Sequence, residues 1–310
     1  MSAAQTRATQ APTKRDGFIV VAVLWMLGAL ALLASIYGTY VIGTAAGFGP
    51  HEDRYRGEAL ASAALELTAY QLIPLAAPHP IHGQFSFRMA RANVAVKFGS
   101  EAARIDLNAA PKELLAGLFH VLGVEHDQAQ QYANRIVSWR TTPTPGQDDK
   151  EAFAYRTAGL NYVPRGARFP HVGELSLILG LSPALVERAL PFVTVHSGRA
   201  QINIVEAAPE VIAALPGLTP ERLNAVLAAR RGAAGDGQAI LALLGPAQTH
   251  ATTEASRASR VNIDISFENG RRMKFEVVIL VFEEGSEPYS VLSWREIDAL
   301  DNAAARTALR

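Results

Sequence analysis

The sequence predicts an α+β fold that is organised around one long N-terminal helix. An uncharged stretch, residues 17–50, opens this helix, and an amphipathic pattern extends it to about residue 74. Apolar and polar residues alternate in 84–107 and again in 260–296, as in strands that bury one face. Between them, residues 108–259 carry helical patterns and two helix openings of the form Ala-Ala-Pro. We therefore expect an antiparallel sheet with a large all-α domain inserted into it.

The apolar stretch is long enough to cross a membrane. As a helix rising ~1.5 Å per residue, residues 18–42 would be roughly 37 Å long, which exceeds the ~30 Å hydrocarbon core of a bilayer. Lys14 and Arg15 precede the stretch, and by the positive-inside rule they hold the N-terminus in the cytoplasm. We expect one membrane pass within a helix of residues 18–74, and a polar tail at 297–310.

Composition narrows the possible chemistry. The chain has 310 residues, 49% of them hydrophobic, and a formal net charge of zero, so it offers no overall attraction to nucleic acid. It has no cysteine, which excludes disulfides, thiolate catalysis and cysteine metal sites. Its histidines are scattered without a His-Glu-x-x-His motif, and neither Gly-x-Ser-x-Gly nor a phosphate loop with its lysine occurs. We expect no enzymatic activity.

Three interpretations of the N-terminus are open on the residues alone. It fits a cleaved secretory signal, although its apolar core exceeds the usual length of about 7–15 residues, and it fits a plain signal anchor. It also resembles the leader of type IV prepilins, because Gly17 joins the basic leader to Phe18 and the apolar run begins at once. In that family a membrane aspartyl peptidase cuts after the glycine, and the new N-terminal residue is methylated. The resemblance implies a leader of residues 1–17, a cut between Gly17 and Phe18, and methylation of Phe18.

Two residues depart from the prepilin pattern. Asp16 stands where a basic or neutral residue is more usual, and Ala22 stands at mature position five, where most prepilins have Glu. The helix that follows supports the resemblance, because a cleaved signal has no reason to lead into a second amphipathic segment. We expect its packed face to contain Leu60, Ala64, Leu67 and Gln71 or Leu72.

Turn residues and a near-repeat organise the rest of the chain. We expect two strands joined at about 91–93, and Glu268-Asn269-Gly270 predicts a second hairpin. In the helical part, Ile105-Asp-Leu-Asn-Ala-Ala-Pro recurs as Ile202-Asn-Ile-Val-Glu-Ala-Ala-Pro, and proline suits the first turn of each helix. Three helical hairpins are expected, and the glycine that would cap the first helix of each is Gly123, Gly180 or Gly217.

These hairpins also resemble helix-hairpin-helix DNA-binding modules. Such modules use Gly-x-Gly, so that backbone N–H groups can approach a phosphate, whereas the second position here is Glu125, Ser182 or Thr219. Basic residues are sparse apart from Arg222 and Arg230-Arg231, although phosphate contacts dominate non-specific affinity. We therefore favour a scaffold without nucleic acid, and a membrane-anchored periplasmic DNA-binding or uptake protein is the alternative.

The order of these features resembles the protein K family of the type II (general) secretion pathway, which are large minor pseudopilins. The resemblance covers roughly residues 14–282 and includes Trp139-Arg140, an acidic loop at 146–149 and Glu174-Leu175. It implies a pilin-like sheet, made by 84–107 with 260–296, and a SAM-like or helix-hairpin-helix-like insert at 108–259. It also implies a minor pseudopilin at the tip of the type II secretion pseudopilus, in protein export across the outer membrane.

The resemblance brings further expectations about location and partners. The chain would be a single-pass protein of the bacterial inner membrane with its C-terminal domain in the periplasm. Prepilin peptidase would process it, and the minor pseudopilins I and J would be its partners. In ordinary pilins the fifth-position Glu pairs with the N-terminal amine of a neighbouring subunit, because unpaired charges are costly in hydrocarbon. Ala22 offers no such carboxylate, which suits a tip subunit that joins only the subunits beneath it.

Relatives in this family bind calcium in the helical insert, and the acidic residues that would correspond here are Asp148, Asp149 and Glu151. Calcium prefers about six to eight oxygen ligands, with carboxylates prominent. Ser138, Thr141 and Thr142 stand where relatives usually have Asp. A plain solvated acidic loop is the alternative interpretation of the same residues.

Overall fold

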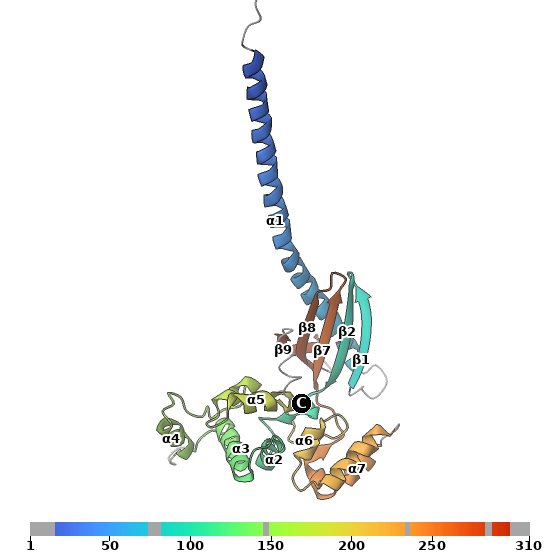
Figure 1. Ribbon diagram of the computed structural model, residues 1–310. Coiled ribbons are helices and arrows are strands. Elements are labelled where there is room, and N and C mark those ends of the chain that lie inside the picture. The colour runs from blue at the N-terminus through green and yellow to red at the C-terminus, as the bar shows by residue number, and fades with distance from the viewer. Residues whose placement is uncertain (1–15, 74–81, 145–148, 233–235, 283–286, 298–310) are drawn as a thin grey trace, which may run out of the picture. The chain divides into compact units, whose positions relative to one another are not determined.

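The computed structural model describes residues 16–73, 82–144, 149–232, 236–282 and 287–297, and within helix α1 it describes the side chains of 18–40 and 53–72. The chain forms two units, Met1–Glu58 and Ala59–Arg310. Helix α1 (Asp16–Leu72, 57 residues) begins in the first unit and ends in the second. The second unit holds a sheet and a helical insert (Figure 1).

Five strands make one antiparallel sheet in the order β1-β2-β7-β8-β9. They are β1 (His82–Met89), β2 (Ala92–Ser100), β7 (Ala258–Phe267), β8 (Arg272–Val281) and β9 (Tyr289–Glu296). The sheet is therefore built from two stretches far apart in the sequence, which meet where β2 pairs with β7. The final pair of this register sets Ser100 opposite Ser259. The predicted α+β class, with an antiparallel sheet drawn from both ends of the body, is confirmed.

The C-terminal part of α1 covers one face of this sheet. Leu60, Ala64 and Leu65 are buried in a core shared with Val94 of β2 and Phe275 of β8. The prediction for Leu67 is wrong, since its side chain is 43% exposed. The buried stripe instead includes small or short side chains a quarter turn further round the helix, so Leu67 lies at its border. Those side chains are Ala61, Thr68 and Ala69.

The two hairpins of the sheet turn differently. Glu268-Asn269-Gly270 joins β7 to β8 with Gly270 at φ +85°, as its sequence predicts. The β1–β2 turn lies at Ala90 and Arg91, slightly before the expected 91–93, and both residues have positive φ, 49° and 59°. Two successive left-handed residues suit a two-residue hairpin, for which Asn-Gly is the favoured sequence.

The insert leaves the sheet after β2 and returns at β7. After the 3₁₀ helix η1 (Glu101–Ala103), its first half lies between two short parallel strands, β3 (Ile105–Asp106) and β4 (Val193–Thr194). Its helices are α2 (Lys112–Val121), α3 (His126–Arg140), α4 (Lys150–Thr157), η2 (Val172–Leu177), α5 (Pro183–Ala189) and η3 (Leu190–Phe192).

The second half repeats this plan in a shorter form. Two parallel strands, β5 (Ile202–Asn203) and β6 (Ala251–Thr252), again open and close it. Between them lie α6 (Pro209–Ala213), α7 (Pro220–Arg231), α8 (Gly237–Leu243) and η4 (Gly245–His250). The near-repeat seen at the two Ala-Ala-Pro sequences therefore extends to the order of elements in each half.

The two halves share one hydrophobic core. Leu115 and Phe119 of α2 are buried in it together with Ile212 of α6. Gly117 permits the close approach of these helices, since a Cβ at this position would overlap the carbonyl oxygen of Ala214. Glycine is therefore required at Gly117 by contact between the halves and not by a turn.

Candidate functional site

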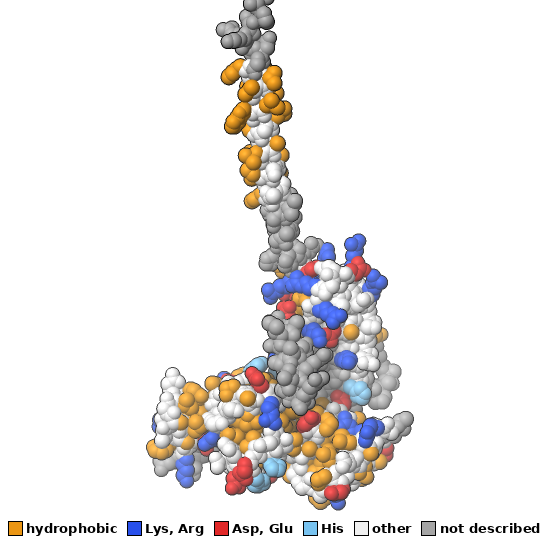
Figure 2. All heavy atoms as spheres, in the orientation of Figure 1, with side chains coloured by type: hydrophobic (Ala, Val, Ile, Leu, Met, Phe, Trp, Pro, Cys, Tyr) orange, Lys and Arg blue, Asp and Glu red, His pale blue; other side chains and the backbone are white. Residues whose placement is uncertain are grey.

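The apolar N-terminal segment is the first candidate for a functional surface. Phe18–Tyr40 is the one span in the described residues that is long and apolar enough to cross a membrane, with a mean hydropathy of 2.6 over 23 residues. At ~1.5 Å per residue its length of about 34 Å matches a ~30 Å hydrocarbon core. Its side chains point outward all round the helix, with Phe18 78% and Trp25 79% exposed (Figure 2). So much exposed apolar surface calls for lipid or for other apolar helices.

The residues of the predicted processing site lie at the start of this segment. Gly17 and Phe18 fall in the first turn of α1, which begins at Asp16. Ala22 is exposed and lies four residues after Phe18, so the two occupy the same face of the helix. A carboxylate at position 22 would therefore sit beside the N-terminus that a cut after Gly17 creates. Cleavage and methylation remain predictions.

The predicted calcium residues do not form a cation site in the described part of the chain. Asp149 caps α4, because its Oδ1 accepts a hydrogen bond from the Ala152 N–H at 2.8 Å. Glu151 Oε2 lies 4.0 Å from Arg135 Nε and has no hydrogen-bond partner, while Asp148 lies outside the described residues. No group of three His, Asp or Glu side chains converges among the residues described. These residues do not fit a calcium ion as they stand, and we derive nothing through one.

A buried ion pair fixes the point where the insert joins the sheet, and the sequence analysis missed it. Glu101 follows β2 directly and is fully buried. Arg260 of β7 binds both of its oxygens, with Nε 2.7 Å from Oε1 and Nη2 3.1 Å from Oε2. Arg104 donates to Oε1 at 3.2 Å, and the Thr194 hydroxyl donates to Oε2 from β4. One carboxylate therefore links the sheet to the opening and the closing strand of the first half.

The electrostatics of this pair favour the ionised form. Burial alone would raise the pKa of Glu101, but the hydrogen bonds and charge of Arg260, with Arg104, hold that pKa below its usual value. Burial also acts against the charge on Arg260, but Glu101 and Glu276 together raise its pKa. Arg260 Nη1 lies 3.1 Å from Glu276 Oε1, so the network continues into β8. The only sequence sign was a Glu directly after an alternating strand, which does not indicate burial.

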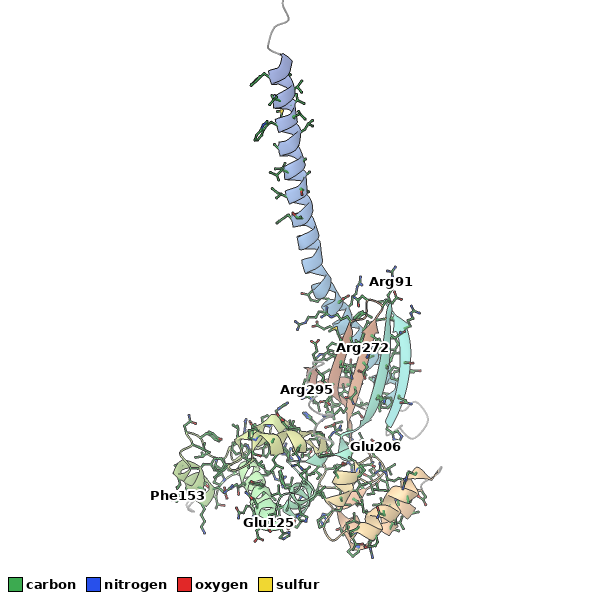
Figure 3. The ribbon with its side chains drawn as sticks, in the orientation of Figure 1. Arg91, Glu125, Phe153, Glu206, Arg272 and Arg295 are labelled. Atoms are coloured by element: carbon green, nitrogen blue, oxygen red, sulfur yellow. The ribbon has the colours of Figure 1, made fainter. Side chains whose placement is uncertain are left out.

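A second carboxylate joins the other half of the insert to the sheet. Glu206 Oε2 accepts a hydrogen bond from the Ser100 N–H at 3.0 Å, and Oε1 lies 3.4 Å from His82 Nδ1 at the start of β1 (Figure 3). Its side chain is only 8% exposed. Burial raises the pKa of Glu206 to about 7, against the smaller lowering effects of the Ser100 N–H and His82. This contact between insert and sheet therefore changes its charge near neutral pH.

Of the arginines that the DNA-binding alternative needs, Arg230 is engaged inside the insert, whereas Arg222 and Arg231 are exposed. Arg230, at the end of α7, donates to the Ala207 carbonyl at 2.7 Å. Arg140, at the corresponding end of α3, donates to the carbonyls of Leu107 and Ala110 at 2.5 and 2.6 Å. In each half of the insert, an arginine at the end of a long helix thus donates hydrogen bonds to the loop that precedes the first helix of that half. Arg222 packs over Gly245, where a Cβ would overlap its guanidinium.

A shallow hollow lies beside the edge strand β9. Glu66 of α1, Phe282, Tyr289 and Val291 line it. The Tyr289 hydroxyl donates to Glu66 Oε1 at 2.9 Å, and burial together with this bond raises the pKa of Tyr289 to about 12. The same sheet edge leaves Trp294 40% exposed. Helix α1 and β9 therefore present aromatic and aliphatic side chains outside the core.

Comparisons with known proteins agree with this architecture. Residues 93–198 match the family model of type II secretion system (T2SS), protein K. One chain of the crystal structure of the GspK-GspI-GspJ complex from the enterotoxigenic Escherichia coli type 2 secretion system is similar to this chain, with a TM-score of 0.58 and 19% sequence identity. The alignment covers 80% of this chain and 98% of that chain. Among curated proteins, none matches the chain.

The family match falls on β2 and on the first half of the insert, the part of the body that carries Glu101 and the first repeat. The structural likeness extends over most of the chain and shows the same fold. Both comparisons agree with the resemblance drawn from the sequence: residues 93–198 match the protein K family model of the type II secretion system, and the fold is that of the similar solved chain.

Proposed function

We propose that this chain is a minor pseudopilin that stands at the tip of the type II secretion pseudopilus and serves its assembly. The observation that carries the proposal is α1 itself, because one helix presents an apolar segment, Phe18–Tyr40, and then packs its C-terminal part on an antiparallel sheet. That combination suits a subunit that is first held in a membrane and later packs with other subunits through the same helix. Prepilin peptidase would cut after Gly17 and the mature chain would begin at methylated Phe18.

The location follows from the same helix. Lys14 and Arg15 before the apolar segment favour a cytoplasmic N-terminus. With one span, the sheet and the insert would then lie in the periplasm and the helix in the inner membrane.

Two features support a place at the tip. Ala22 offers no carboxylate to the N-terminal amine of a subunit stacked next to it, and such an amine is costly to leave unpaired in hydrocarbon. The insert between β2 and β7 is larger than the sheet that carries it, and bulk of this kind fits more easily at a filament end than within its repeat. The partners would be the minor pseudopilins I and J, which accompany the similar protein in the solved complex.

Processing at Gly17 is the test of the proposal. Mass analysis of the full chain, co-expressed with a prepilin peptidase, should give a mature N-terminus at methylated Phe18. Gly17→Leu should keep the leader and block secretion, because the peptidase needs a small residue before the cut. Gly28→Ala is the matched control, since it changes a glycine of the same helix whose Cβ would meet nothing within 4 Å. An intact leader on the unaltered chain, or normal secretion by Gly17→Leu, would overturn the proposal.

A further inference from the structure

The two turns at one end of the sheet form a cluster of arginines. The β1–β2 turn carries Arg88 and Arg91, and the β7–β8 turn carries Arg271 and Arg272. The turns lie side by side, because the Glu268 N–H donates to the Arg91 carbonyl at 3.2 Å. Figure 2 shows Lys and Arg side chains gathered at this end of the sheet. We call these two turns the arginine turns.

Positive charge exceeds negative charge in the arginine turns. Residues 88–91 and 268–272 contain four arginines and one acidic residue, Glu268, whose Oε1 accepts a hydrogen bond from Arg88 Nη2 at 2.5 Å. Arg91 and Arg272 are exposed, and Figure 3 shows them on the two hairpins. On strands β7 and β8 beyond the turns, Lys274 Nζ lies 3.1 Å from Asp264 Oδ1, and the charges of this ion pair cancel. The turns therefore form a positively charged end on a chain whose formal net charge is zero.

An apolar side chain and backbone strain accompany the charge. Met89 lies between the two arginines of the β1–β2 turn and is 52% exposed. Ala90 and Arg91 both hold positive φ, which costs roughly 1 kcal/mol or more for a residue with a Cβ. Asn-Gly would make the same turn without that cost. The turn therefore keeps side chains that its geometry does not favour, as expected where those side chains contact something.

We propose that the arginine turns bind the anionic headgroups of the membrane that holds α1. Arginines beside an exposed methionine suit the boundary between headgroups and acyl chains, where the guanidinium groups meet lipid phosphates and the apolar side chain enters the interface. Within the second unit, the α1 segment that packs on the sheet starts at the end of the sheet where the turns lie (Figure 1). A soluble anion would satisfy the arginines but would leave Met89 in water.

The connection between the units allows this contact. Residues 41–58 join the end of the apolar segment to the packed part of α1, and as a helix they would be about 27 Å long. The proposal requires that this stretch let the arginine turns reach the membrane surface. The surface would hold the body before the subunit enters a filament and would be released when it does.

The test uses the full chain in lipid nanodiscs, without any partner subunit. Because the chain has no cysteine, Met89→Cys carries a single fluorescent label, and Gln84→Cys places a matched label on the same strand away from the turn. Lipids spin-labelled at the headgroup quench a label that touches the membrane surface. We expect quenching at position 89 and not at position 84. The quenching should require phosphatidylglycerol and be absent in phosphatidylcholine alone. Added salt should remove it.

Charge variants complete the test. Arg91→Gln with Arg272→Gln should weaken the contact by about fivefold per arginine, the usual effect of one basic residue at an anionic surface. Lys97→Gln with Arg257→Gln, two exposed basic residues away from the turns, should leave it unchanged. Equal quenching at both labels, quenching without phosphatidylglycerol, or equal loss in both double variants would overturn the proposal. So would shielding of position 89 only after partner subunits are added, which would assign the turns to a protein contact.

Discussion

Glu101 and Arg260 form a two-point ion pair at the place where the insert leaves the sheet and returns to it, with N–O distances of 2.7 and 3.1 Å. Removing one member of a buried pair leaves the other charge without its partner, which typically costs about 3–5 kcal/mol. We expect Glu101→Gln to lower the free energy of unfolding of the full chain in detergent by this order. Chemical denaturation measures it.

The control for this experiment is an ion pair of the same sheet that faces water. Asp264→Asn removes the partner of Lys274, and exposed pairs contribute less than about 1 kcal/mol. Because the pKa of Glu101 is lowered on folding, its contribution is present above its ordinary pKa of 4.5 and is lost as the pH falls through the lower folded value. If the two variants lowered the free energy of unfolding equally, the Glu101–Arg260 ion pair would not stabilise the connection between insert and sheet.

Glu206 should make stability depend on pH in the opposite direction. Its pKa is raised to about 7 on folding, so its contribution is complete below the unfolded value of about 4.5 and disappears as the pH rises through 7. Glu206→Gln should therefore be more stable than the unaltered chain at pH 8, by at most about 3 kcal/mol, with the advantage shrinking toward pH 5. Thermal unfolding between pH 5 and 8 measures this, with the exposed Glu113→Gln as the control. An advantage that did not vary with pH would contradict the assignment.

Gly117→Ala tests the contact between the two halves of the insert. Alanine favours a helix over glycine by about 1 kcal/mol, but its Cβ would overlap the Ala214 carbonyl oxygen. Overpacking of a rigid contact typically costs 1–3 kcal/mol or more, so we expect a net loss of stability of about that size. Denaturant titration measures it, and Gly38→Ala, at a helical site with open space, should show no loss. A stabilised Gly117→Ala would mean that the halves are not in contact at this point.

Calcium binding is decided by titration of the full chain. Asp149 and Glu151 contact α4 and Arg135 in the structure, and we therefore expect neither heat on adding calcium nor a change of melting temperature on adding a chelator. Asp149→Ala should weaken the start of α4 by about 1 kcal/mol, with or without calcium, because it removes a helix cap. Calcium-dependent heat that Asp149→Ala abolishes would restore the calcium site.

Local patterns predicted the elements that depend on local sequence. The apolar run from Phe18 predicted the membrane segment, and Asn269-Gly270 predicted its hairpin, because each carries its structure in neighbouring residues. The face of α1 was misjudged at Leu67, since the width of a buried stripe depends on the sheet that it meets. Sequence spacing does not supply that information.

The contacts that join the insert to the sheet could not be predicted, because they connect residues far apart in the sequence. Glu101 meets Arg260 across more than 150 positions, and Glu206 meets Ser100 and His82 across more than 100. The strands that close each half, such as β3 and β4, have two residues each and carry no periodicity. Only the folded chain brings these groups together.

The pairing of Ser100 with Ser259 bears on how such a chain could arise. The last residue before the insert and the first residues after it are neighbours across one ladder, so excision of what lies between would leave β2 and β7 ready to be joined by a short hairpin. The insert therefore begins and ends at one place in the sheet, between β2 and β7. A shortened chain that links residue 100 directly to residue 259 through Asn-Gly would keep this register and remove the insert.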